Sequence, residues 1–111
     1  MIIGKEFKFE AAHHLPGHPK CGRTHGHTYH VWVEVEGEVD PYTGMVMDLH
    51  DLGKEVNTLI DPWDHNDLNN FFTTPTCENI CQVLWDRLTL HIPLCKVKVQ
   101  EGEGGYAIKL D

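Results

Sequence analysis

The sequence has no long hydrophobic run and few basic residues, and each absence argues against a class of protein. No apolar segment approaches the roughly 20 residues that a membrane-spanning helix needs. The first residues, Met-Ile-Ile-Gly-Lys, lack the apolar stretch of a secretory signal peptide. Lysine and arginine number 9 against 17 aspartates and glutamates, a formal net charge of −8 that repels nucleic-acid phosphates and anionic lipid. We therefore expect a cytoplasmic protein that binds neither nucleic acid nor membranes.

The chain is short, and it contains no repeat, linker or low-complexity segment. Its 111 residues suffice for one two-layer domain, residues 1–111, but are few enough that oligomerisation would add useful burial. Nothing in the sequence indicates an oxidising compartment, so we expect free thiols rather than disulfides. Two of the four cysteines lie four residues apart on a predicted helix, where packed thiols are a simpler interpretation than half a metal site. The cysteines are Cys21, Cys77, Cys81 and Cys95.

Period-two alternation predicts two strands in the first third of the chain. In residues 7–13 the odd positions are Phe, Phe, Ala and His, and residues 25–36 repeat the pattern with two histidines, a tyrosine and three valines. If the two strands form an antiparallel hairpin, His13 ends one apolar face where His25 and His27 begin the other. The connecting loop would carry Cys21 over that end of the sheet.

Helical spacing and helix-stop signals predict two helices, followed by two more strands. Together with the first two strands, this order indicates an α+β protein: a four-stranded, predominantly antiparallel sheet with two helices on one face. The expected elements after residue 36 are a helix between the N-cap Asp48 and Pro62, an ordered loop over 63–70, a helix opened by Pro75-Thr76 and interrupted by Pro93, and strands over 95–101 and 106–110 joined by a glycine-rich turn.

Three histidines give the strongest chemical signal. His25 and His27, two residues apart on a strand, point to the same face, and His13 from the neighbouring strand can complete a corner of three imidazoles. Imidazole nitrogens suit zinc, and three protein ligands leave one coordination position for water or substrate. Some of the nine histidines must fall near one another by chance, but this trio lies on an otherwise apolar face. We predict a Zn²⁺ site at these three residues.

Cys21 lies beside this trio in the sequence, and its role is open. The thiol could be a fourth zinc ligand, a buried small hydrophobe, or a nucleophile or base. Lys20 and Arg23 flank it, and cations near a thiol favour the thiolate, which suits proton abstraction near neutral pH.

Three further positions carry groups that could bind or transfer protons. Asp64 could fix the tautomer of His65 and make it a proton relay, although such neighbours are common in loops. Glu101 continues an apolar strand face, so it either lies at the strand's exposed end or awaits a ligand with paired N–H donors, as a guanine-like ring has. Thr76 and Glu78 fit helix capping and ligand binding equally well.

Six motifs together resemble the 6-pyruvoyl-tetrahydropterin synthase family over nearly the whole chain. The short spacing from cysteine to histidine and the brevity of the chain are most similar to its 6-carboxytetrahydropterin synthase branch, which feeds queuosine and other 7-deazaguanine compounds. The motifs are Phe9-Glu-Ala-Ala-His13, Cys21-x-x-x-His25-Gly-His27, Gly44-Met-Val-Met-Asp48, Asp64-His65-x-x-Leu-Asn69, Pro75-Thr-Cys-Glu-Asn79 and Val97-Lys-Val-Gln-Glu101.

The resemblance implies a tunnelling fold (T-fold), in which trimers close a twelve-stranded barrel and two trimers stack into a homohexamer with active sites between subunits. The implied substrate is 7,8-dihydroneopterin triphosphate, and no nicotinamide or flavin is required. The implied roles are zinc binding for His13, His25 and His27, general base for Cys21, a proton relay from a neighbouring subunit for Asp64 and His65, pterin anchoring for Glu101, and the rest of the pterin pocket for Thr76, Cys77 and Glu78. Lys20 and Arg23 are the candidates for contacting the triphosphate.

The implied reaction makes the protein a zinc-dependent carbon–oxygen lyase that eliminates triphosphate. The carboxy branch then releases acetaldehyde, whereas the pyruvoyl branch retains the side chain as a diketone. The alternatives are therefore a 6-pyruvoyl-tetrahydropterin synthase, or a non-catalytic zinc- and pterin-binding protein in which Cys21 is a permanent fourth ligand. Gly102 follows Glu101 where the family usually has threonine or serine, which puts one hydrogen bond of the pocket in question.

Overall fold

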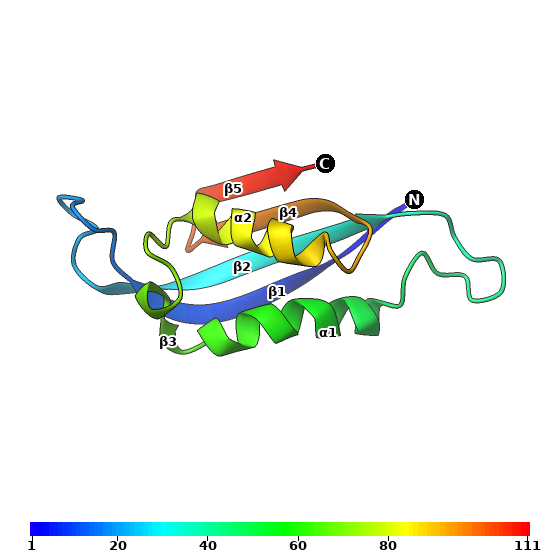
Figure 1. Ribbon diagram of the computed structural model, residues 1–111, viewed down its shortest axis with the longest axis horizontal. Helices are drawn as coiled ribbons and strands as arrows, with labels where there is room; N and C mark the ends of the chain where they lie inside the picture. The colour runs from blue at the N-terminus through cyan, green and yellow to red at the C-terminus, as the bar shows by residue number, and fades with distance from the viewer.

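The computed structural model describes all 111 residues as a five-stranded sheet with two α-helices (Figure 1). The strands lie in the order β3-β1-β2-β4-β5, and every neighbouring pair is antiparallel except β1 and β3. The elements are β1 Ile2–His13, β2 His25–Glu36, α1 Leu49–Ile60, β3 Asn66–Asp67, α2 Cys77–Leu88, β4 Leu94–Glu101 and β5 Gly105–Leu110, with 3-10 turns η1 Asp61–Trp63 and η2 Leu68–Asn70.

The α+β class and the two helices are as predicted, but the sheet has five strands and not four. The extra strand, β3, falls within the segment 63–70 that we expected to be an irregular loop. Hydrogen bonds to Glu10 dock this segment on β1: the Asp64 carboxylate accepts from the Glu10 N–H at 2.9 Å, and the His65 N–H donates to the Glu10 carbonyl. A two-residue strand shows no periodicity, so only these long-range contacts define it.

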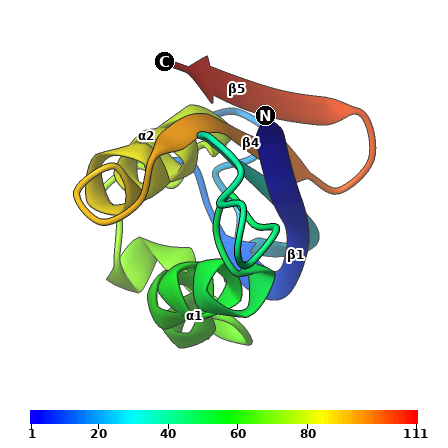
Figure 2. The same ribbon diagram turned by 90° about the vertical axis from the view of Figure 1, so that its right-hand side faces the viewer.

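The core lies between the sheet and the two helices, which cover the same side of it (Figure 2). Alternate residues of β1 and β2 face this side, and the Phe9 and Tyr29 rings stack there with centroids 4.9 Å apart. Leu84 of α2 is fully buried in this layer, so truncating it to alanine would cost about 2–5 kcal/mol of stability. This packing fixes the position of the β1–β2 hairpin, and therefore the position of the residues at its end.

Side-chain caps fix where both helices begin. The Asp48 carboxylate accepts from the His50 N–H, and the Thr76 hydroxyl accepts from the Asn79 N–H, which satisfies backbone donors that the helix itself leaves free. The second cap also sets the path of the segment before α2, whose Pro75 carbonyl contacts the site described below. Neither 12-residue helix is long and apolar enough to span a bilayer.

Candidate metal centre and its surroundings

The β1–β2 hairpin brings three histidine rings together at one end of the sheet. Its antiparallel register pairs His13 with His25 and Ala11 with His27, so all three side chains project on the core side. The Nε2 atoms of His13 and His25 are 3.1 Å apart, and the three ring centroids lie 4.6–5.0 Å from one another. His13 is completely buried. The convergence expected from strand alternation is therefore present.

Carbonyl groups outside the cluster set the orientation of two of these rings. The His13 Nδ1–H donates to the Pro75 carbonyl at 2.8 Å, and the His25 Nδ1–H donates to the Arg23 carbonyl at 2.7 Å. A carbonyl oxygen can only accept, so in the neutral rings the proton stays on Nδ1 and the Nε2 lone pair faces the cluster. Metal-bound histidines typically have such outer partners, which fix the tautomer of the ligand.

A carboxylate completes the cluster. Glu101 Oε1 lies 2.8 Å from His27 Nε2 and 3.4 Å from His13 Nε2. One ligand atom from each of Glu101 and the three histidines lies within 4.8 Å of all the others. From the sequence we expected Glu101 either at the strand's exposed end or as an anchor for a ligand with paired N–H donors, and not beside the histidines. The β2–β4 register, which sets Glu101 opposite Tyr29, brings it beside the histidines, and that register is not visible in the sequence.

The charges in the cluster are strongly coupled. Burial alone would lower the pKa of His13, but its hydrogen bonds to Glu101 and Pro75 raise it overall. The same contact with His13 lowers the pKa of Glu101 despite partial burial. Burial lowers the pKa of His27, whose Nε2 is buried and makes no hydrogen bond. Three imidazoles and one carboxylate that converge, with one ring nitrogen free of hydrogen bonds, are a donor set that suits Zn²⁺.

Asp64 and His65 form the expected pair on the segment that leads into β3. Asp64 Oδ2 is 2.9 Å from His65 Nδ1, and the hydrogen bond from Glu10 N–H, followed by that from His65, lowers the pKa of Asp64. His65 adopts a left-handed backbone conformation with φ 57°. Its largely exposed ring lines a cavity of about 570 Å³ that His27 also lines.

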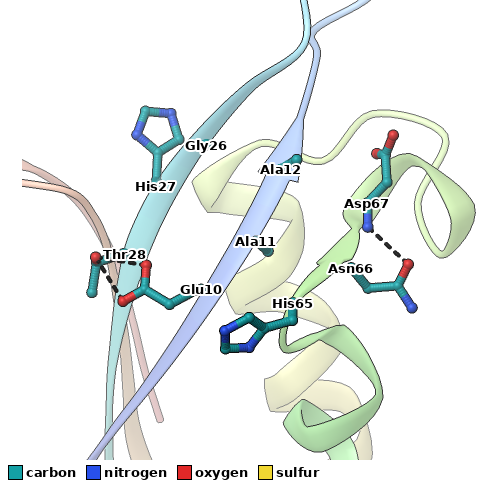
Figure 3. Close-up of a pocket in the computed structure, with 9 residues that line it drawn as sticks. All are labelled: Glu10, Ala11, Ala12, Gly26, His27, Thr28, His65, Asn66 and Asp67. Atoms are coloured by element: carbon teal, nitrogen blue, oxygen red, sulfur yellow. Dashed lines mark hydrogen bonds between the residues drawn. The ribbon is translucent and has the colours of Figure 1, made fainter.

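Figure 3 shows this cavity along β1 and β2, with His65 beside β1. The Glu10 carboxylate accepts from the Thr28 hydroxyl at 2.8–2.9 Å and lies on the cavity wall. Glu10 was not among the site residues predicted from the sequence. Its alternation with Phe9 and Ala11 placed it on the polar face of a strand, which was the only available signal.

The predicted general base lies in the loop between β1 and β2, which extends from the sheet (Figure 1). The half-buried Cys21 is held by its backbone: its N–H donates to His18 Nδ1 at 2.8 Å, and its carbonyl accepts from the Leu15 N–H at 2.7 Å. Its sulfur does not belong to the cluster of ligand atoms. Lys20 and Arg23 are exposed and form no ion pair, so they remain free to meet an anion.

The structure separates the three candidates at the start of α2. Thr76 caps the helix, and the buried Cys77 thiol donates to the Val99 carbonyl at 2.9 Å. Burial, with a smaller effect of the Glu101 carboxylate, raises the pKa of Cys77 to about 11. Glu78 is exposed and lines a different cavity, between α2 and β5, away from the histidine cluster.

The family model described as 6-pyruvoyl tetrahydropterin synthase matches residues 2–109. The chain belongs to this family. An Archaeoglobus fulgidus protein, provisionally named as a 6-carboxy-5,6,7,8-tetrahydropterin synthase, is 44% identical over 108 residues, which cover 96% of this chain and 93% of that protein. Human 6-pyruvoyl tetrahydrobiopterin synthase is 41% identical over 100 residues, 80% of this chain and 69% of the human one.

A solved structure supports the same grouping. Caenorhabditis elegans 6-pyruvoyl tetrahydropterin synthase matches with a TM-score of 0.90 and 28% sequence identity, and the match covers 100% of this chain and 95% of that one. The family resemblance predicted from the motifs is thus confirmed. The relatives' names divide between carboxy and pyruvoyl products, so membership of the pterin synthase family does not by itself fix the product.

Proposed function

We propose that this member of the pterin synthase family is a zinc-dependent 6-carboxy-5,6,7,8-tetrahydropterin synthase. It converts 7,8-dihydroneopterin triphosphate to 6-carboxytetrahydropterin, with loss of triphosphate and acetaldehyde. The observation that carries this proposal is the convergence of three imidazole Nε2 atoms, two of them oriented by carbonyl groups, at one end of the sheet. The higher identity and fuller coverage of the Archaeoglobus protein favour the carboxy product.

His13, His25 and His27 would hold the zinc ion. The buried His27 Nε2, which makes no hydrogen bond, supports this assignment, because a buried nitrogen without a hydrogen bond is costly unless something binds it. When bound, zinc supplies a Lewis acid that lowers the pKa of the substrate's side-chain hydroxyls and acidifies the neighbouring C–H bond.

The proton transfers belong to three other side chains. Cys21 Sγ acts as the general base that takes the carbon-bound proton. Asp64 Oδ2 accepts the His65 Nδ1–H, which leaves His65 Nε2 facing away from the pair to exchange protons with the substrate. Because the pKa of Asp64 is lowered, its carboxylate stays ionised at neutral pH and holds that tautomer.

Binding is assigned to groups at the cluster and in the loop. Glu101 anchors the paired N–H donors of the pterin ring, a contact in which both carboxylate oxygens accept. Thr76, Cys77 and Glu78 complete the pterin pocket in this proposal, although Glu78 would have to act in an assembly, because within one chain it lines another cavity. Lys20 and Arg23 take the triphosphate.

The proposal includes a homohexamer of one-domain chains, in which the relay residues of one subunit serve the site of its neighbour. Two features support association between copies. The outer edge of β5 and the outer edge of the first half of β1 have no strand partner, and such edges readily pair with another chain. Exposed apolar residues lie along them, at Ile2, Ile108 and Leu110.

The test is turnover by the purified, zinc-loaded protein. Incubation with dihydroneopterin triphosphate should release triphosphate and acetaldehyde and leave 6-carboxytetrahydropterin, identified by mass spectrometry. Cys21→Ala should abolish turnover and keep zinc, whereas Cys95→Ala, at a half-buried thiol on β4, should change neither. No loss of triphosphate from the wild-type protein would refute the enzyme assignment, and full turnover by Cys21→Ala would refute the base.

The second candidate is 6-pyruvoyl-tetrahydropterin synthase, which the human relative and the Caenorhabditis elegans structure favour. The same incubation separates the two, because a pyruvoyl product retains its side chain and releases no acetaldehyde. The third alternative, a non-catalytic protein with Cys21 as permanent zinc ligand, is disfavoured because Glu101 and not Cys21 is the fourth group in the cluster.

A further inference from the structure

Glu101 contacts the histidines through one oxygen only. Its Oε1 approaches two imidazole nitrogens, at 2.8 Å from His27 and 3.4 Å from His13, and no hydrogen bond or ion pair involves Oε2. The side chain is about one quarter exposed. A carboxylate at this depth needs compensation, and here the compensation comes from the cluster itself.

Three of the separations between ligand atoms in the cluster are close to those around a shared metal, and all four atoms lie within 4.8 Å of one another. Zinc binds nitrogen and oxygen at about 2.0–2.1 Å, so neighbouring ligand atoms of a tetrahedral site lie about 3.3 Å apart. The three short separations in the cluster are 2.8, 3.1 and 3.4 Å. They bracket that value.

The orientation of the His27 ring also supports a shared metal. Although its Nε2 lies 2.8 Å from Glu101 Oε1, the pair does not have the geometry of a hydrogen bond, so the ring nitrogen is not aimed at the oxygen. Two donor atoms that are close but not directed at one another are arranged as ligands are when both face a common third point.

We propose that Glu101, through Oε1, is the fourth ligand of the metal in the substrate-free protein, and that a pterin ring draws it away and opens that position. A bidentate contact with paired N–H donors requires both carboxylate oxygens, so Glu101 cannot serve the ring fully and the metal at once. Binding of the pterin ring and the opening of a coordination position on the metal are then one event. The second half of this inference rests on the proposed function, whereas the first half depends only on the cluster.

Cobalt(II) substitution tests both halves, because the visible absorption of Co²⁺ responds to its ligand number and type. The substrate-free wild-type protein should bind one Co²⁺ with the intense bands of a four-coordinate site. Glu101→Gln, which keeps the size of the side chain, should bind Co²⁺ at least about tenfold more weakly and with altered bands. Glu103→Gln, an exposed carboxylate two residues away, makes the same charge change outside the cluster and should match wild type.

Unsubstituted pterin is the probe for the exchange, because it has the ring but neither side-chain hydroxyls nor phosphates to bind the metal. Its addition should change the Co²⁺ bands of the wild-type protein as it binds, and binding is followed independently by pterin fluorescence. Glu101→Gln should show no such change in its bands. Thermal unfolding of the metal-free variants checks that the substitution leaves the fold intact.

Each outcome decides a separate statement. Equal Co²⁺ affinity and equal bands for wild type and Glu101→Gln would overturn the ligand assignment. Pterin binding that leaves the wild-type bands unchanged would overturn the exchange. Absence of turnover with dihydroneopterin triphosphate, alongside the predicted Co²⁺ behaviour, would refute the proposed function while leaving Glu101 as a metal ligand.

Discussion

Replacing Gly22 by alanine should disable the loop that carries Cys21 without unfolding the protein. A Cβ atom on Gly22 would lie 2.6 Å from the His18 carbonyl oxygen, whereas real Cβ contacts are essentially never below 3.0 Å, so the loop must open by at least 0.4 Å. The movement reaches Cys21 directly, because the His18 ring accepts the Cys21 N–H and the His18 carbonyl accepts the Gly22 N–H.

The expected effect is on kcat. A displacement of 1 Å at a reacting group can cost about a hundredfold in rate, so a shift of this size should lower kcat by roughly tenfold. Zinc content and the melting temperature should stay near wild type, because the loop lies outside the core cluster. Gly105→Ala is the matched control, since its added Cβ meets no atom within 4 Å. Unchanged kcat for Gly22→Ala would refute the idea that this loop's geometry positions the base.

Four further predictions concern the relay, a buried thiol and the cluster. Asp64→Asn removes the oxygen that accepts the His65 Nδ1–H, so kcat should fall by about a hundredfold with zinc retained, and steady-state kinetics with metal analysis check this. Burial raises the pKa of Cys77 from 9.0 to about 11, so in native protein at pH 8 iodoacetamide should label Cys21 and spare Cys77, as peptide mass spectrometry will show. The stability due to the protonated Cys77 thiol is fully present below pH 9 and is lost as pH rises toward 11, which urea unfolding at several pH values measures against Cys77→Ala. His25→Ala should lower zinc affinity by at least about tenfold in competition with a chelator, and wild-type affinity in that variant would remove His25 from the site.

The histidine corner could be predicted because strand geometry determines it. Alternation sets His25 and His27 on one face of their strand. In an antiparallel hairpin the end of the first strand lies opposite the start of the second, which places His13 opposite them. The observed register, His13 against His25, is that arrangement. Helix starts were also predictable, since capping at Asp48 and Thr76 depends on neighbours within three residues.

The remaining features depend on contacts between distant residues. Glu101 joins the cluster through the register of β4 against β2, and β3 exists because Asp64 and His65 bond to Glu10, which precedes Asp64 by 54 positions. The extension of β1 back to Ile2 was missed for a local reason, because residues 2–6 run apolar, apolar, glycine, lysine, glutamate and show no alternation. Pairing between distant strands leaves no periodic pattern in the sequence, so periodicity cannot predict it.

X-ray absorption at the zinc edge of the purified protein identifies the atoms that bind the metal. We expect one zinc per chain, surrounded by nitrogen and oxygen at about 2.0–2.1 Å, with the multiple-scattering pattern of three imidazoles and no sulfur. A zinc–sulfur distance of about 2.3 Å, or a protein that retains no zinc after dialysis, would contradict this expectation.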